Sequence, residues 1–289
     1  MSAKPKIYQD FHVTGLKTTE QAMTPQMIEK TLTDAGITVI SNEDLNEAFT
    51  KSYKRSDFKV YSIITYYHKE ISKKLLTLYP NMGLFYPSRL VVFQKKNDPI
   101  LWIALVSSRT MGKILTLKKR EKLLADLDRS VLRPIIKTIK KPRFNQINSS
   151  QLRQLRPLIL HQKELKDDKS IAFIEARLKK AITTSSFQLK NVMNLNKALG
   201  KETPYDFYKS YQLRNVKTLF TKSTLYPESA AHTPYHLILY KKKGSRYLTV
   251  TQIDTAHLID SSDITDTASL KALIGDQKEL DDLLKKVTK

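Results

Sequence analysis

The stretch LYPNMGLFYPSRLVVFQKK, residues 78–96, returns later in the chain as LYPESAAHTPYHLILYKKK, residues 225–243. A shift of 147 residues aligns the two stretches without a gap, and it also places Phe58 and Tyr61 on Tyr205 and Tyr208. Further upstream, MIEKTLTDA (27–35) resembles FIEARLKKA (173–181) and DLNEAF (44–49) resembles NLNKAL (194–199) in the same order, at offsets of 146 and 150. Order kept over such a length favours a tandem duplication, because chance matches do not stay in register.

Local patterns within one unit predict alternating helices and strands. Thr24 and Pro25 have the residue types of an N-cap and a first helical position, and Gly36 stands where a helix commonly ends. Residues 57–67 are rich in β-branched and aromatic side chains, which indicates a strand. The segments after Pro87 and Pro234 read as β-hairpins with polar turns.

The predicted fold class is α+β, with two repeated small domains in which helices pack on one face of a mostly antiparallel sheet. We expect the first α+β repeat at residues 1–112 and the second at 157–289. A basic helical connector at 113–156 should join them, either as a link or as a helical domain of its own.

Composition bounds the class of protein. The chain has 289 residues, 40% of them hydrophobic, which is enough for two or three globular cores, and a formal net charge of +22. Such a charge attracts acidic proteins, glycans, anionic lipid surfaces or nucleic acid, although it also fits a chain from a generally basic proteome. The absence of cysteine excludes disulfides and thiol chemistry, and no apolar run is long enough for a membrane span. We expect a secreted or periplasmic protein whose leader has been removed, and a cytoplasmic location stays open.

The order of elements in residues 60–105 resembles the bacterial domain-of-unknown-function family 302. In that family a strand runs into a short Asn/Pro-containing motif and a helix, followed by a proline-led strand, a turn, another strand and a final helix. The preceding helix, glycine and strand in IEKTLTDAGITVI (28–40) also fit. The resemblance implies an α+β sandwich of the TATA-binding-protein-like type and subunits that pair, with no established activity. Two copies in one chain would then form an intramolecular pseudo-dimer.

The chain departs from the family at a motif where many members carry Cys/Gly-Asn-Pro. The first copy has Tyr66, Tyr67 and His68 there, and the second has Arg214 and Asn215 after a leucine. These five residues are our candidates for a pocket, although a partly exposed histidine at a strand end is the simpler explanation for His68.

Catalytic and metal signatures are weak throughout. His232 and His236 have a helical metal-pair spacing, but Pro234 lies between them and no third ligand is apparent. Seven glycines in the chain exclude a glycine-rich phosphate loop. We therefore expect no metal, no cofactor and no catalytic residue, and whether the chain is an enzyme stays open, with the balance against it.

The basic segment is the strongest functional signal. From Lys113 to Lys163 the chain carries 14 Lys/Arg against 3 Asp/Glu. We predict anionic-partner binding by its densest part, which holds Lys137, Lys140, Lys141 and Arg143. The favoured function is a non-catalytic secreted or periplasmic binding or accessory protein that acts through paired domains and this connector. The alternative is a nucleic-acid-binding protein, although aromatic residues for base stacking are sparse in the segment; an enzyme of unrecognised type comes third.

Overall fold

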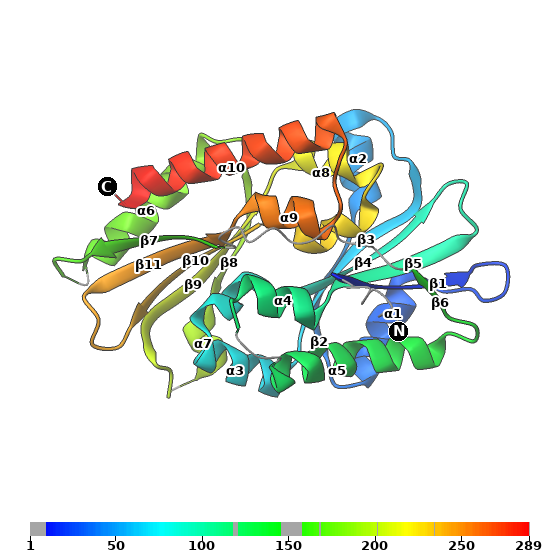
Figure 1. The fold of residues 1–289 in the computed structure, drawn as a ribbon, viewed down its shortest axis with the longest axis horizontal. Helices are drawn as coiled ribbons and strands as arrows, with labels where there is room; N and C mark the ends of the chain where they lie inside the picture. The colour runs from blue at the N-terminus through cyan, green and yellow to red at the C-terminus, as the bar shows by residue number, and fades with distance from the viewer. Residues whose placement is uncertain are drawn as a thin grey trace, which may run out of the picture.

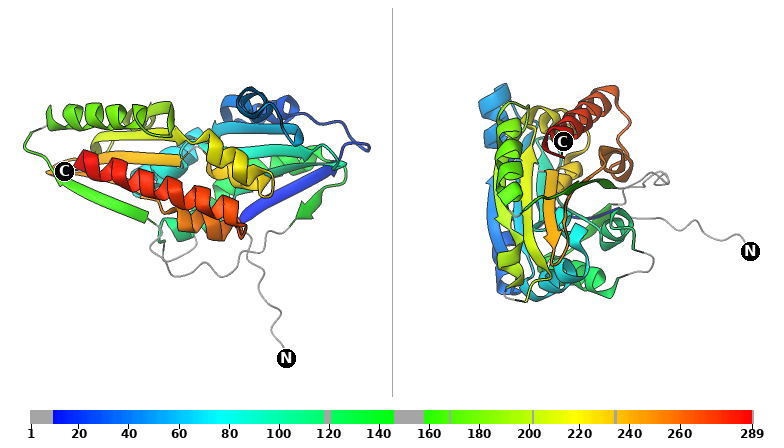
Figure 2. Two further views of the ribbon diagram at one scale, coloured as in Figure 1. Left: turned by 90° about the horizontal axis from the view of Figure 1, so that it is seen from above. Right: turned by 90° about the vertical axis from the view of Figure 1, so that its left-hand side faces the viewer.

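The computed structural model describes residues 10–117, 121–145, 158–167, 169–200, 202–233 and 235–288. It has an α+β fold built around two antiparallel sheets, as the sequence predicts. Figures 1 and 2 show the two halves of the chain side by side. We call the half up to β6 the first unit and the half from β7 onward the second unit.

Both units run through the same elements in the same order. The first unit contains β1 (Phe11–Lys17), α1 (Pro25–Asp34), β2 (Thr38–Asp44), α2 (Leu45–Tyr53), β3 (Phe58–Tyr67), α3 (Lys69–Leu78), the short 3-10 helix η1 (Pro80–Phe85), β4 (Ser88–Lys95), β5 (Ile100–Val106), α4 (Ser108–Ile114), α5 (Lys122–Thr138) and β6 (Arg143–Asn145). The second contains β7 (Leu158–Glu164), α6 (Lys169–Thr183), β8 (Gln188–Asn194), α7 (Leu195–Leu199), β9 (Tyr205–Arg214), α8 (Val216–Ser223), the 3-10 helix η2 (Pro227–His232), β10 (Tyr235–Lys242), β11 (Tyr247–Ile253), α9 (Thr255–Ser261) and α10 (Thr267–Thr288). Only β6 lacks a counterpart among the described residues of the second unit.

The strand order is also the same in both sheets. The first sheet runs β2-β3-β4-β5-β1-β6, and the second, read from its other edge, runs β8-β9-β10-β11-β7. The register repeats as well, since Phe11 pairs with Val106 and Leu158 pairs with Ile253, each 147 residues later. The predicted hairpins are confirmed as β4–β5 and β10–β11.

Local signals explain where several helices begin and end. The Thr24 side chain accepts a hydrogen bond from the Met27 N–H and caps α1, with Pro25 at the first helical position, as predicted. Gly36 follows the helix with a φ of +79°, a backbone conformation that glycine adopts without steric cost.

Each sheet is covered on both faces. Helices α1 and α5 bury residues such as Ile28 and Val131 against one face of the first sheet, where Leu90 and Val92 of β4 point. The alternating residues of the same strand, Val91 and Phe93, point to the opposite face and join a second core. Because both faces are apolar, β4 reads as a continuous hydrophobic run instead of an alternating one.

That second core lies between the units. It combines first-unit residues from the sheet, α3 and η1 with second-unit residues such as Tyr205, Tyr208 and Ile238. The packing is reciprocal: η1 lies on β10 while η2 lies on β4, and α3 contacts α7 while α2 contacts α8. The sequence predicts helices on one face of each sheet; the other face is covered by elements of the other unit, which the local pattern does not reveal.

The described part of the basic segment packs on the first unit. Helix α5 buries Leu124, Leu127 and Val131, and β6 pairs with β1 at the edge of the first sheet. Residues 118–120 and 146–156 of the predicted connector, and residue 157 after it, lie outside the described residues. The division of the chain at residues 112 and 156 therefore stays a prediction.

Candidate functional site

The five predicted pocket residues do not surround one cavity. Tyr66 is 1% exposed and belongs to the core under α1 and α5, whereas Tyr67 packs against Tyr86 on the other side of the sheet. Arg214 and Asn215 lie at the corresponding end of β9 in the second unit. The two sets occupy equivalent positions, each at the end of the strand that leads into a helix.

His68 and Asn215 have the same structural role. The His68 Nδ1 accepts a hydrogen bond of 3.4 Å from the Ile71 N–H at the start of α3. Asn215 Oδ1 accepts from the N–H groups of Lys217 and Thr218 at the start of α8. Both residues therefore act as N-caps, a role for which asparagine is one of the preferred types.

Arg214 makes an ion pair between the units. Its Nη1 and Nη2 donate to the two carboxylate oxygens of Glu43 at 2.6 and 2.7 Å, and Lys190 donates to the same carboxylate at 3.2 Å. Burial raises the pKa of Glu43, but the hydrogen bond and charge of Arg214, with a smaller contribution from Lys190, outweigh it and hold this pKa below its usual value. The arrangement links the edge of the first sheet to the second unit.

A buried polar cluster lies at the centre of the interface. The Nη1 of Arg89 on β4 lies 2.7 Å from the Nε2 of His236 on β10, and these two residues are 147 positions apart. His236 Nδ1 lies 3.2 Å from the carbonyl oxygen of Gly83 in η1 and 3.4 Å from the hydroxyl of Ser210. An imidazole that carries its proton on Nδ1 donates to Gly83 and accepts from the guanidinium, so this geometry requires neutral His236. Burial and the charge of Arg89 lower its pKa well below the usual value, in agreement with that state.

A small cavity of about 20 Å³ opens beside this cluster. Its polar lining includes Arg89, His232, His236 and Gln252, and the Oε1 of Gln252 has no hydrogen-bond partner among the described residues. A space of this size has room for about one water molecule. The cavity therefore suits a bridging water and not an organic substrate.

Other buried titratable groups surround the same interface. Lys222 is 2% exposed, its Nζ donates to the Ser229 carbonyl oxygen at 3.0 Å, and burial lowers its pKa to about 8. Burial raises the pKa of Glu228 to about 7. Asp276 of α10 accepts hydrogen bonds from Tyr235, Thr218 and Asn215, which ties α10 to α8 and β10. Lys222 and Asp276 join elements to one another. No group of three or more His, Cys, Asp or Glu residues in the described part of the chain could hold a metal ion.

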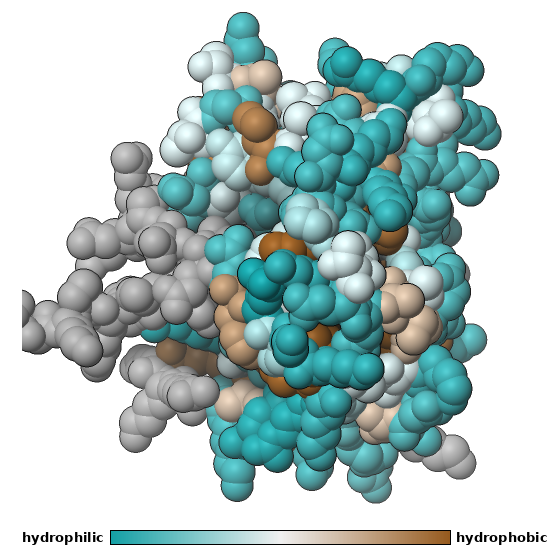
Figure 3. All heavy atoms as spheres, turned by 90° about the vertical axis from the view of Figure 1, so that its right-hand side faces the viewer, coloured by the Kyte–Doolittle hydropathy of each residue, from teal (hydrophilic) through white to brown (hydrophobic). Residues whose placement is uncertain are grey.

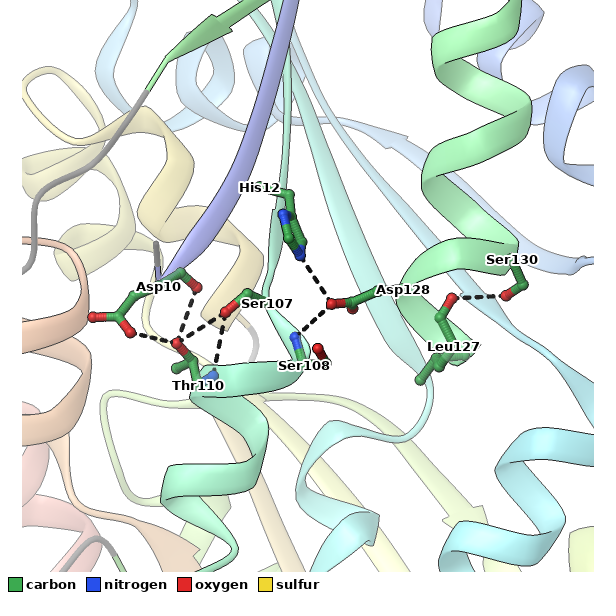
Figure 4. A network of polar contacts seen from close by, with 8 residues as sticks. All are labelled: Asp10, His12, Ser107, Ser108, Thr110, Leu127, Asp128 and Ser130. Atoms are coloured by element: carbon green, nitrogen blue, oxygen red, sulfur yellow. Dashed lines mark hydrogen bonds and ion pairs between the residues drawn. The ribbon is translucent and has the colours of Figure 1, made fainter. Parts of the chain in front are cut away.

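A histidine–aspartate pair lies in a separate network near the start of β1 (Figure 4). His12 Nε2 lies 2.9 Å from Asp128 Oδ2, which also accepts a hydrogen bond of 2.8 Å from the Ser108 backbone N–H. Beside it, Thr110 Oγ1 donates to the carboxylate of Asp10 at 2.7 Å. Since Ser108 contributes its backbone and not its hydroxyl to Asp128, the contacts fasten α4 and α5 to β1 and do not form a nucleophile relay.

The predicted anionic-partner residues lie together on the surface. Lys137, Lys140, Lys141 and Arg143 are all exposed where α5 ends and β6 begins, and Lys141 lies 3.8 Å from Glu20. This end of the first unit is covered mainly by hydrophilic residues (Figure 3). Helix α5 carries three further exposed cations at spacings of seven and four residues, so they share one face of the helix: Lys122, Arg129 and Arg133. These three residues extend the group, and sequence reasoning did not single them out. We call these seven residues the basic face.

No helix in the described ranges is both long enough and apolar enough to cross a membrane.

A match to a family model supports the resemblance for the first unit. One solved structure that is similar is the "uncharacterized conserved protein DUF302 from Bacillus stearothermophilus", with 12% sequence identity, a TM-score of 0.38, and coverage of 44% of this chain and 96% of that one. None of the curated proteins compared matches this chain. Residues 14–141 match the family model described as "Domain of unknown function DUF302", which confirms the resemblance to this family over the first unit.

Proposed function

We propose that the chain is a non-catalytic binding or accessory protein, in which two paired units form one body that presents the basic face to an anionic partner. The observation that carries this proposal is the basic face itself. Its seven cations are exposed, and only two acidic partners lie beside them among the described residues, Asp126 with Arg129 and Glu20 with Lys141. Exposed ion pairs of this kind contribute little free energy, so they do not neutralise the attraction for a polyanion.

The paired units explain how this face is held in place. We infer that they are two copies of one domain that form an intramolecular pseudo-dimer. The equal order of elements, the equal strand order and the contacts between residues 147 positions apart support this inference. Since α5 packs on the first sheet and the second unit packs on the opposite face of that sheet, the basic face lies on a rigid support.

The interior favours binding at the surface over catalysis within. The buried Arg89 and His236 hydrogen-bond to each other, and the cavity beside them has a volume of about 20 Å³. We place the protein outside the cytoplasm, in the periplasm or secreted, as part of the same proposal.

A charge-reversal variant tests the proposed function. Lys137→Glu, Lys140→Glu, Lys141→Glu and Arg143→Glu together should weaken binding to immobilised heparin, polyglutamate, DNA or anionic vesicles, whichever the wild type binds, by tenfold or more at 0.15 M salt. The matched control makes the same change in net charge on the exposed side of α10, with Lys271→Glu, Lys278→Glu, Lys285→Glu and Lys286→Glu.

The control decides what the result means. Strong loss in the first variant with little change in the second supports a localised binding face. Equal loss in both variants contradicts the proposal, because net charge alone would then explain the binding. Preferential binding of DNA or RNA over the other polyanions, lost in the first variant alone, would select nucleic acid as the partner.

A further inference from the structure

An open groove lies between α3 and the start of α5, next to the basic face. Its volume is about 400 Å³, and it is lined by Glu70, Lys73, Lys74, Thr77 and Leu78 of α3 and by Leu123 of α5. Leu78 is 58% exposed although it is a large apolar residue, and it stands outside the buried face that α3 forms with Leu75 and Leu76. The groove therefore has an apolar floor that the described chain leaves uncovered.

The groove is held in shape from both sides. Tyr79, directly after α3, donates a hydrogen bond of 2.6 Å from its hydroxyl to the carboxylate of Glu121, and the same Glu121 caps α5 by accepting from the Leu123 N–H. The end of one helix is thus tied to the start of the other. A ligand would meet a preformed surface and would not have to order it.

Charge surrounds the apolar floor. Lys73 and Lys74 are exposed at its rim, Glu70 is the one acid in the lining, and Lys122 next to Leu123 begins the basic face. From there the cations continue along the 17 residues of α5, a length of about 25 Å. A partner that fits both features has an apolar side chain and several carboxylates on one stretch.

The second unit lacks the same combination. Leu225 stands 147 residues after Leu78 and is 56% exposed, but Phe220 and Thr221 occupy the positions that correspond to Lys73 and Lys74. Phe220 stacks on Tyr53 at 4.0 Å between ring centroids instead of facing solvent as a cation would. The exposed leucine therefore repeats, and the charged rim does not.

We propose that this groove receives an apolar side chain of an acidic protein segment, whose carboxylates bind along the basic face. The inference rests on the proposed function and specifies its partner as a protein. The lining holds no aromatic ring on which a nucleobase could stack, and the apolar floor is too small and too closely rimmed by charges to enter a lipid surface.

Two synthetic acidic peptides test the inference. They have equal length and charge and differ only in a central leucine, which is serine in the second peptide, and binding to the full chain is followed by fluorescence anisotropy at 0.05 and 0.15 M salt. Wild type should bind the leucine peptide about tenfold more tightly, since burying part of one leucine contributes that much. Leu78→Ser should bring this preference close to one, while Leu225→Ser, which removes an equally exposed leucine, should leave it unchanged.

The outcomes separate the two proposals. If both peptides bind wild type equally and binding falls with salt, the groove proposal is overturned and the basic face stands. If neither peptide binds but DNA, heparin or anionic vesicles do, the protein partner is wrong while the basic face again stands. If none of these polyanions binds, both proposals fail. Circular dichroism of Leu78→Ser must match wild type, and the charge reversal at Lys137 to Arg143 should weaken both peptides while leaving their ratio unchanged.

Discussion

The hydroxyl of Tyr208 joins the two units, and its removal should destabilise both together. Tyr208 on β9 is 1% exposed; its hydroxyl accepts a hydrogen bond of 3.0 Å from the Gly83 N–H and donates to the Pro80 carbonyl oxygen, both in η1 of the other unit. Tyr208→Phe removes both of these hydrogen bonds from the buried interface, and each contributes about 1 kcal/mol. The expected loss in the free energy of unfolding is therefore about 2 kcal/mol.

Two probes in urea denaturation measure this loss and its reach. Trp102, the single tryptophan, lies on β5 in the first unit, whereas far-UV circular dichroism reports on both units. Because the substituted residue lies in the second unit, a coupled interface should shift the Trp102 fluorescence transition and the dichroism transition equally. The control Tyr247→Phe changes a residue that is 43% exposed and should alter the free energy of unfolding by less than about 0.5 kcal/mol.

The equivalent residue provides an internal check. Tyr61 stands 147 positions before Tyr208. Its hydroxyl donates to Ser223 Oγ at 2.7 Å and lies 3.0 Å from the Pro227 carbonyl oxygen across the same interface. Tyr61→Phe should cost about 1 kcal/mol, less than Tyr208→Phe, because the Tyr61 hydroxyl only donates, whereas the Tyr208 hydroxyl both donates and accepts. A Trp102 transition that stays in place while the dichroism transition shifts in Tyr208→Phe would refute the reasoning, since the units would then unfold independently.

Two more predictions concern the same interface. A methyl group on Gly83 would lie 2.6 Å from the Tyr208 hydroxyl, so Gly83→Ala should lower the free energy of unfolding by about 1–3 kcal/mol in urea titrations. The control Gly275→Ala, at an open helical position, should raise the free energy of unfolding by about 0.5–1 kcal/mol. Burial holds the pKa values of His232 and His236 well below 6.5 in the folded chain. On acidification these two histidines therefore become protonated in the unfolded chain before they do so in the folded one. The free energy of unfolding should fall as pH drops below about 6.5, by at most about 1.4 kcal/mol per pH unit for each histidine. Glu228, with a pKa raised to about 7, has the opposite effect on stability. Its stabilising contribution to the free energy of unfolding is fully present below pH 4.5 and is lost as pH rises through 7. The urea midpoint of Glu228→Gln should therefore fall more steeply than that of wild type between pH 6.5 and 5, and an unchanged slope would contradict this account.

Sequence reasoning recovered the elements of the fold because their signals are local. The cap at Thr24, the prolines before β4 and β10 and the polar turns of the hairpins each depend on a few neighbouring residues. The match at an offset of 147 also predicted that two units would have one architecture. What the repeat could not give was their arrangement, because two copies can be linked as separate bodies or packed together without any change in the internal pattern.

A signal for the packed arrangement was nevertheless present in the strands. The runs LVVF (90–93) and LILY (237–240) are apolar without alternation, which is typical of strands buried on both faces. Helices on one face, as expected from the sequence, would leave every second residue of these runs in water. The candidate pocket was less accessible to this kind of reasoning: Tyr66 and His68 are neighbours in sequence, but one lies in a core and the other caps a helix.

On our inference that the two units are copies of one domain, the polar contacts between them give a physical reason for carrying both in one chain. Where residues 147 positions apart face each other, two identical copies would place a residue against itself. An arginine at both positions of the Arg89–His236 contact, or a glutamate at both positions of the Glu43–Lys190 contact, would bring like charges together in or near a buried interface. Such pairs are strongly destabilising unless one partner becomes neutral or changes sign. A single chain that carries both copies can differ at just these positions, and the observed pairs, arginine with neutral histidine and glutamate with lysine, are the complementary solutions.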